Sequence, residues 1–480
     1  MAKSIKKNFL YNILLNISKV IFPLITAPYV SRVLEPDGVG LFNFANTYAN
    51  YFALFAALGI PLYGIREIAK VKDDQKEQTK FVSEIISISA VVTFICTVLF
   101  FLSLLFVPQL SANYLIFIVA GIALYITPFH IDWYFSGMEE FGYITFRSLS
   151  IRVLSVLLLF ILVHDKDDLI IYVAINACCG ALNSLWNFVK LYNLGIHPYF
   201  TLRGKVHVKP LLILFSSSIA VAVYNLLDTI MLGFMADYDQ VGYYNCATHI
   251  SKALLPVVTS LAAVALPRIA TLKQENRLTE INALLSKSFS IVGFLSFPIA
   301  FAVIAISPVF VPLFYGQLFY GTILPLQIII LTVIVIGFNN LTGWQILLGL
   351  GFDKKFLHAI IVGAVTNFVL NLCLIPSMGA IGASIASIIA ETMVLLVMLF
   401  FVYKYTFVRI DISRELLMDI LIASLFFPIS FLCKIISEGW TFVILASLLC
   451  SAMYMSLQYL FGNTSETMIL NAIKVKFKQK

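Results

Sequence analysis

Fourteen apolar stretches alternate with short polar gaps along the chain. Each stretch is long enough to cross a hydrocarbon layer of about 30 Å as a helix. The stretches lie near residues 10–33, 41–64, 81–107, 112–136, 147–163, 168–194, 211–235, 242–266, 286–314, 322–349, 356–375, 380–403, 415–436 and 439–461. This pattern predicts an all-α polytopic membrane protein with 14 transmembrane helices.

Positive charge is concentrated in every second gap between these stretches. One set of gaps holds 25 of the 32 Lys and Arg residues, whereas the alternate set holds only Lys166 and Lys434. Short loops rich in Lys and Arg remain in the cytoplasm. Only an even number of spans, with both termini in the cytoplasm, gives this pattern. Because topology accounts for the net charge of +7, we expect no nucleic-acid partner.

The composition is that of a membrane protein rather than a soluble domain. Hydrophobic residues make up 60% of the chain and charged residues 12%, whereas a soluble domain carries about twice that charged fraction. The outward gaps are too short to fold into a catalytic domain, so we expect the function to reside in the membrane and not to be enzymatic. The first stretch contains Lys19 and lacks a small-residue cleavage site, which indicates an uncleaved span. All seven cysteines fall inside predicted spans and are expected to be small buried hydrophobic residues.

The chain also contains an internal repeat. A shift of 202 positions aligns residues 39–46 with 241–248, where four of eight residues are identical, and aligns Arg66 with Arg268. Six predicted spans separate the two copies, so both copies enter the membrane from the same side. Parallel repeats of this kind occur in transporters that bind substrate between two lobes and rock around it.

The repeat predicts three segments. Residues 1–203 would form one six-helix lobe and residues 204–406 a second, related to the first by a pseudo-two-fold axis along the membrane normal. Residues 407–480 would add two further helices and a basic cytoplasmic tail.

Several charged or polar side chains fall inside predicted spans. A charge in hydrocarbon costs roughly 3 kcal/mol or more, so it usually faces a cavity or a partner. Lys19 and Lys252 lie near mid-depth, one in each half, which suits an anionic ligand such as a phosphate. The repeat places Asn50 at the position equivalent to Lys252. In the alternative interpretation, the two lysines pair with Glu391, Asp228 or a carbonyl group and only hold helices together.

Further cations lie nearer the membrane surfaces. Arg66, Arg147 and Arg268 are predicted to surround the inner mouth of a cationic cavity. Arg32 lies near the outer end of the first span, and Arg152 lies near the cytoplasmic end of the fifth. Residues so close to a helix end can also extend to the interface as simple anchors.

A separate set of oxygen-bearing side chains could hold a hard cation such as Na⁺. Asn367 and Asn371 share one helical face at i, i+4 spacing, and Ser384 follows in a stretch of small residues that permits close helix approach. Together with Asp228 they form a candidate Na⁺ site, and Glu391 is a candidate for ion coupling or helix pairing. The alternative is interhelical hydrogen bonding. No resident cofactor is expected, only coupling to Na⁺ or H⁺.

Several motifs resemble one transporter family. Residues 31–45 read SRVLEPDGVGLFNFA, and 58–69, 132–137, 266–268 and 374–383 carry further matches. These segments resemble Wzx-type oligosaccharide flippases of the polysaccharide transporter family, in the superfamily that also holds lipid II flippases and multidrug exporters.

The resemblance implies a V-shaped pair of six-helix lobes in the bacterial inner membrane. It also implies that an oligosaccharide on undecaprenyl pyrophosphate is moved from the inner to the outer leaflet. Some relatives that flip lipid II bind Na⁺ among spans 7, 11 and 12, where Asp228, Asn367, Asn371 and Ser384 occupy comparable places. An acidic ligand of the family on span 11 is replaced here by Asn371.

The main hypothesis is therefore a flippase that works by alternating access, with Lys19 and Lys252 contacting the pyrophosphate. The alternatives are a multidrug or cation antiporter, a lipid II flippase, and a membrane enzyme such as a polysaccharide polymerase. The expected partners are the lipid-linked glycan, the bilayer and other polysaccharide assembly proteins, and we expect a monomer.

Overall fold

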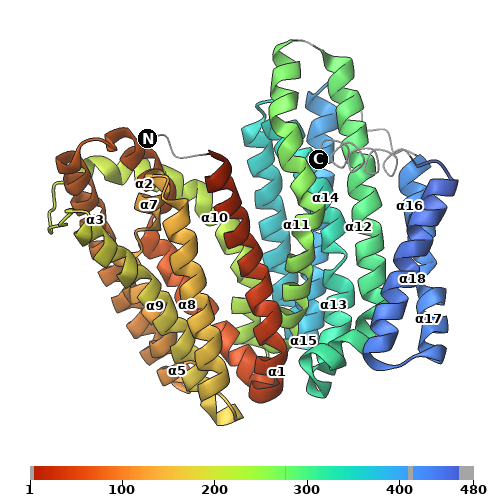
Figure 1. Cartoon of the computed structure of the whole chain (residues 1–480), viewed down its shortest axis with the longest axis horizontal. Helices are drawn as coiled ribbons and strands as arrows, with labels where there is room; N and C mark the ends of the chain where they lie inside the picture. Colours follow the sequence, from red (N-terminus) through yellow and green to blue (C-terminus); the bar gives the residue numbers. More distant parts are fainter. Residues whose placement is uncertain (1–4, 276, 409–413, 464–480) are drawn as a thin grey trace. The chain divides into compact units, whose positions relative to one another are not determined.

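The computed structural model describes residues 5–275, 277–408 and 414–463, and regular secondary structure in these ranges is helical (Figure 1). The prediction of an all-α, multi-pass membrane protein is confirmed. By their contacts, the residues fall into two compact units, Met1–Gly242 and Tyr243–Lys480. The segments predicted from the repeat are different: they have a boundary at residue 203 and a separate segment at 407–480.

The helices of the first unit are α1 (Ile5–Ala57), α2 (Ile60–Ile68), η1 (Ala69–Val71), α3 (Gln75–Phe106), α4 (Pro108–Ser111), α5 (Tyr114–Ala120), α6 (Ile122–Tyr125), η2 (Thr127–Phe129), α7 (Asp132–Gly137), α8 (Phe141–Leu162), η3 (Lys166–Asp168), α9 (Leu169–Asn193) and α10 (Lys205–Met235). The next helix, α11 (Tyr238–Gln274), begins in this unit. The second unit continues with α12 (Leu278–Tyr315), η4 (Gln317–Thr322), α13 (Ile323–Ile329), α14 (Thr332–Asn340), η5 (Leu341–Leu348), α15 (Asp353–Tyr405), α16 (Arg414–Ser424), α17 (Phe426–Ile436) and α18 (Gly439–Leu460).

Nine helical segments among the described residues are long and apolar enough to cross a membrane. Two of the helices, α1 and α15, contain 53 residues each, whereas one crossing needs about 20. Each is interrupted once by a residue with non-helical dihedral angles. The total of 14 spans stays a prediction.

The interruptions have local causes. Glu35 in α1 has φ 58° and ψ 174°, and Pro36 follows it, which disfavours helical backbone at the preceding residue. The chain reverses direction there (Figure 1). In α15 the break is at Gly379, with φ 52°, a conformation that glycine adopts without a Cβ clash. Both breaks coincide with predicted outward gaps.

Helix α1 contacts several helices of the first unit. It packs against α3, α5, α8 and α10. Figure 1 shows α8 and α9 side by side, and the two helices are in extensive contact. Helix α10 also packs on α2, which explains why it belongs to this unit although the repeat assigned it to the second lobe.

Two glycines that the repeat aligns lie against each other. A Cβ at Gly40 would overlap the backbone oxygen of Tyr238, and a Cβ at Gly242 would overlap the backbone oxygen of Pro36. The contact is reciprocal, because Pro36 and Tyr238 are also related by the shift of 202 positions. Only glycine permits the two backbones to approach this closely.

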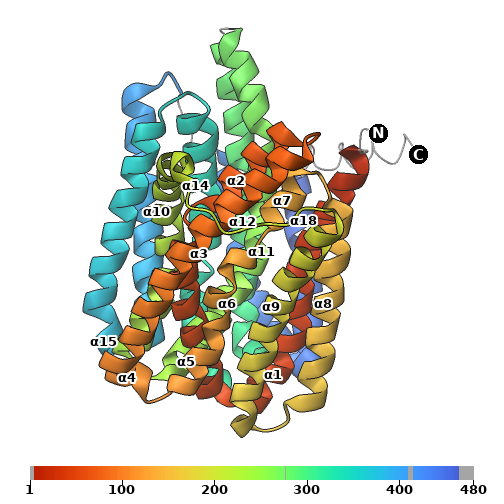
Figure 2. The same cartoon turned by 90° about the vertical axis from the view of Figure 1, so that its left-hand side faces the viewer.

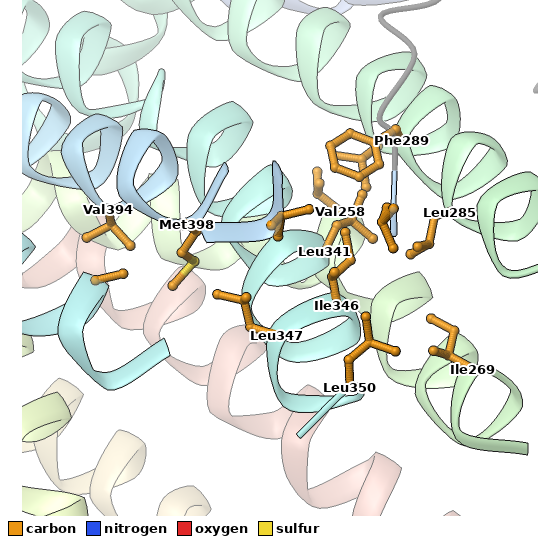
Figure 3. Packing of buried hydrophobic residues seen from close by; sticks show 14 of the residues in the cluster. Val258, Ile269, Leu285, Phe289, Leu341, Ile346, Leu347, Leu350, Val394 and Met398 are labelled. Atoms are coloured by element: carbon orange, nitrogen blue, oxygen red, sulfur yellow. The ribbon is translucent and has the colours of Figure 1, made fainter. Parts of the chain in front are cut away.

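The second unit has its own core, shown in Figure 3. Val258 of α11, Leu285 and Phe289 of α12, Leu341 of η5 and Met398 of α15 belong to one buried cluster. Lipid tails are as apolar as these side chains, so van der Waals packing rather than exclusion of water stabilises such a core in a membrane.

Replacing Gly40 by Ala is expected to destabilise the protein. The new methyl group must displace the backbone at Tyr238, and overpacking of this kind costs about 1–3 kcal/mol. Thermal unfolding of the detergent-solubilised protein would show a lower midpoint. Gly180→Ala on α9 is the matched control, because no atom lies within 4 Å of the added Cβ. Equal midpoints for the two variants would contradict the tight Gly40 contact.

Candidate functional site

A cavity of about 440 Å³ lies within the first unit. It is bordered by α1, α2, α3, α6, η2, α7 and α9, and Figure 2 shows α6 between α3 and α9, both of which it contacts. Its volume is in the range of about 300–1,000 Å³ that is typical of small-molecule sites. The polar residues on its wall are Asn46, Asn50, Ser89, Thr127, His130, Asp132 and Asn176.

Helix periodicity places two amides on the cavity wall. Asn46 and Asn50 are one turn apart on α1, and Nδ2 of Asn50 donates a hydrogen bond of 3.2 Å to Oδ1 of Asn46. Ala53 and Ala57 continue the same face of the helix and also line the cavity. The small side chains leave the space that the amides then border.

Helix α9 contributes a similar face from the other side. Asn176, Ala177 and Gly180 line the cavity, and Nδ2 of Asn176 donates a 2.9 Å hydrogen bond to the carbonyl oxygen of Tyr172. A polar side chain flanked by small residues therefore recurs on both helices that border the space.

The predicted fourth span, residues 112–136, is not one continuous helix. It is divided into α5, α6, η2 and α7, with Gly121 between the first two and Pro128 inside η2. Non-helical backbone at membrane depth is tolerated where it is buried in protein or lines a cavity. Here Thr127, Pro128 and His130 line the cavity, so the irregular segment forms part of its wall.

A buried polar cluster supports this wall. Nη2 of Arg147 donates to Oδ1 of Asp132 at 2.9 Å, and Nδ2 of Asn187 donates to the same oxygen at 2.5 Å. Nη1 of Arg147 donates to Oδ1 of Asn187. The guanidinium also lies 5.7 Å from the ring centroid of Tyr143, within the range of a cation–π contact.

The members of the cluster differ in exposure. The side chain of Arg147 is 1% exposed and that of Asp132 is 41% exposed. The sequence predicted Arg147 as an accessible cation at an inner mouth, but the structure buries it behind Asp132. Its charge is neutralised by the carboxylate and by the oxygen of Asn187.

The two lysines at predicted mid-depth are exposed in their respective units. Lys19 lies in the first half of α1 among exposed Leu14, Ile17 and Ile21, and its Nζ donates to Oδ1 of Asn16 at 3.3 Å. Lys252 is exposed on α11. The phosphate site that would use both lysines stays a prediction.

The other predicted cations whose side chains are described do not line the cavity of the first unit. Arg66 is exposed and forms a 2.9 Å ion pair with Glu67, and Arg32 is exposed and donates to the carbonyl oxygen of Pro28 at 3.0 Å. Arg152 is half-buried on α8. The side chain of Arg268 lies outside the described residues.

The residues of the candidate Na⁺ site are divided between the units. Asn367, Asn371 and Ser384 are buried on α15 of the second unit, whereas Asp228 lies on α10 of the first. Nδ2 of Asn371 donates to Oδ1 of Asn367 at 3.2 Å. The Na⁺ site stays a prediction.

Glu391 connects two helices of the second unit. Its Oε2 accepts a 2.7 Å hydrogen bond from Nδ2 of Asn339, and its backbone oxygen accepts a second bond of 3.1 Å from the same amide. This contact joins α15 to α14, which is the helix-pairing role that the sequence offered for Glu391.

Sequence reasoning missed most of the cavity wall. Of the predicted substrate-binding residues whose side chains the structure describes, Asn50 alone lines this cavity. Asn46, which is hydrogen-bonded to Asn50, could have been found from the sequence. The two residues have the same i, i+4 spacing as Asn367 and Asn371. Asn176 and His130 gave no comparable signal, since their place depends on how α9 and the irregular segment pack.

Comparison with known proteins identifies related sequences. The family model "Polysaccharide biosynthesis protein" matches residues 5–273. A "Putative O-antigen transporter" of Escherichia coli (strain K12) is 27% identical over 413 residues, covering 83% of this chain and 97% of that protein. The "Probable flippase AglR" of Haloferax volcanii is 26% identical over 172 residues, or 35% of this chain and 36% of that protein.

Two solved structures share the fold. The lipid II flippase MurJ, in an inward closed conformation, matches with a TM-score of 0.74 at 16% identity, over 94% of this chain and 99% of that one. An inward-facing multidrug transporter of the MATE family matches with a TM-score of 0.59 at 15% identity, over 80% of this chain and 94% of that one.

The exposure difference between Arg147 and Asp132 predicts unequal effects of mutation. Asp132→Ala leaves a buried guanidinium without its counter-charge, which costs about 3–5 kcal/mol. Arg147→Met should cost less, because the remaining carboxylate is partly open to water. Denaturant unfolding of the purified protein would measure both.

The double variant completes the cycle. Asp132→Ala combined with Arg147→Met removes both charges and should be more stable than Asp132→Ala alone. If the decreases in unfolding free energy of the two single variants instead added up in the double variant, the ion pair would not be the source of the destabilisation.

Proposed function

Because this chain belongs to the family of polysaccharide biosynthesis proteins, we propose that it is a flippase for a lipid-linked oligosaccharide. The substrate would be a glycan on undecaprenyl pyrophosphate, moved from the cytoplasmic to the periplasmic leaflet of the bacterial inner membrane. Both chain termini would lie in the cytoplasm, in accordance with the distribution of Lys and Arg.

The observation that carries the proposal is a cavity within a bundle of apolar helices, whose largely apolar wall carries several polar side chains. Three amides and a carboxylate border a space at the level of predicted membrane spans. Polar groups in the membrane usually face a cavity or a partner and mark substrate paths. A hydrophilic passenger explains why this unit maintains such a wall rather than a continuous apolar core.

Moving a glycan across the membrane requires polar side chains along its path. A hydroxyl group taken from water into an apolar medium without a hydrogen-bond partner costs roughly 2–7 kcal/mol. A glycan carries many hydroxyl groups, so its spontaneous passage across a bilayer is very slow. A path lined by amides replaces the hydrogen bonds to water, while the polyprenyl tail remains in lipid.

Alternating access is the proposed mechanism. The two lobes would rock around the glycan, with Lys19 and Lys252 contacting the pyrophosphate and a Na⁺ or H⁺ gradient driving the cycle. The reciprocal contact of Gly40 with Tyr238 and of Gly242 with Pro36 supports the pseudo-two-fold relation, because symmetry-related segments contact each other in this way.

A multidrug or cation antiporter is the second candidate. Asp132 supports it, since the carboxylate is partly exposed on the cavity wall and would attract a cationic drug. However, Asp132 is the single acidic side chain among the described residues that line this cavity. The match to a "Putative O-antigen transporter" over 83% of this chain also favours the flippase.

The role of the lysines is tested by glycan export. In cells that lack the native gene, we expect the variant with Lys19→Ala and Lys252→Ala to reduce surface polysaccharide about tenfold or more, because two charged contacts to the pyrophosphate are lost. The unflipped lipid-linked precursor should accumulate.

Lys434→Ala is the matched control, because Lys434 is exposed in the last turn of α17. Replacement of both lysines by Arg should retain most export. Normal export by the double Ala variant at normal protein levels would reject the phosphate role. Drug tolerance without any glycan defect would instead favour the antiporter.

A further inference from the structure

The cavity wall of the first unit carries hydrogen-bonding groups of a specific kind. Among the described residues that line it there is no Lys or Arg side chain. A pyrophosphate needs cationic partners, so this wall does not suit the charged end of a lipid carrier. It suits a ligand whose groups both donate and accept hydrogen bonds.

We propose that this cavity is a recognition site for uncharged sugar residues of the glycan, separate from the site that holds the pyrophosphate. The proposal rests on the proposed flippase function and deepens it. Neutral and N-acetylated sugars would bind there, and acidic sugars would be disfavoured.

The amides supply paired donors and acceptors. Asn50 uses one N–H on Oδ1 of Asn46, and Asn176 uses one N–H on the oxygen of Tyr172. An amide has two N–H donors and an oxygen with two lone pairs, so Asn46, Asn50 and Asn176 all keep capacity for a ligand. A hydroxyl group is itself a donor and an acceptor, and so is an N-acetyl group.

Asp132 supplies the charge that selects against acidic sugars. Arg147 and Asn187 both donate to its Oδ1, and among the described residues Oδ2 accepts no hydrogen bond. The cluster therefore holds the carboxylate in one orientation while its side chain stays 41% exposed. A ligand hydroxyl can donate to this oxygen, whereas a ligand carboxylate would be repelled by it.

The apolar part of the wall suits the faces of a sugar ring. Phe42 lines the cavity and is partly exposed, whereas Trp133, which also borders the cavity, is buried. The ring of Trp133 is fixed by an edge contact with Phe81, with centroids 5.8 Å apart, and by close packing on Gly64. Rigid aromatic and aliphatic surfaces with a few placed polar groups are typical of small-molecule sites.

Binding of free sugars to the purified full-length protein tests the proposal. The probes are glucose, galactose, N-acetylglucosamine, N-acetylgalactosamine and glucuronate, measured by saturation-transfer NMR at millimolar concentration. At least one neutral or N-acetylated sugar should bind about tenfold more tightly than glucuronate, because the carboxylate of Asp132 repels an anion.

Two variants locate the site. The first is the double variant Asn46→Leu/Asn50→Leu, and the second is the single variant Asn176→Leu. Each should weaken binding of that sugar about tenfold, because hydrogen bonds to the sugar are lost. Asn193→Leu, an exposed position on the same helix α9, should have no effect. Any one of three results would overturn the proposal. Glucuronate could bind as tightly as the neutral sugars, both cavity variants could bind the sugar as tightly as the wild-type protein, or no neutral sugar could bind.

The same variants in cells separate this proposal from the flippase function. If the wild-type chain restores glycan export and Asn176→Leu does not, both proposals stand. If both chains restore export equally, the sugar site fails and the flippase function stands. If the wild-type chain does not restore export, the flippase function itself fails.

Discussion

A fully charged side chain in the dry interior of a membrane bundle constrains the whole first unit. Arg147 is buried, so a carboxylate and an amide oxygen must lie within hydrogen-bond distance of it. Asp132 is the first residue of α7, which follows the segment divided into α5, α6 and η2. The same segment lines the cavity through Thr127, Pro128 and His130. The ion pair, the broken span and the cavity are therefore one arrangement.

A second constraint acts where the repeats meet. The approach of Gly40 to Tyr238 and of Gly242 to Pro36 leaves no room for a side chain at either glycine. Close backbone approach replaces hydrophobic driving force as the source of helix association in lipid.

The local features of the fold could be predicted, whereas the contacts of single side chains could not. The reversal at Glu35 follows from Pro36, and the break at Gly379 lies in a predicted gap, because Pro and Gly act on the backbone next to them. Span 4 was predicted as continuous, since Gly121 and Pro128 are common in membrane helices and apolar length alone does not show a break. The burial of Arg147 depends on Asp132 and Asn187, which are distant in sequence, and no local pattern connects the three.

The separation of charged and neutral groups has a consequence for transport. A flippase must hold a pyrophosphate and a glycan, and the two require opposite environments: cations for the first, and matched donors and acceptors without net positive charge for the second. In the first unit Arg147 is kept away from the cavity surface by Asp132, so the wall presents amides and a carboxylate instead. The buried ion pair thus provides both structural support and the charge that the sugar would meet.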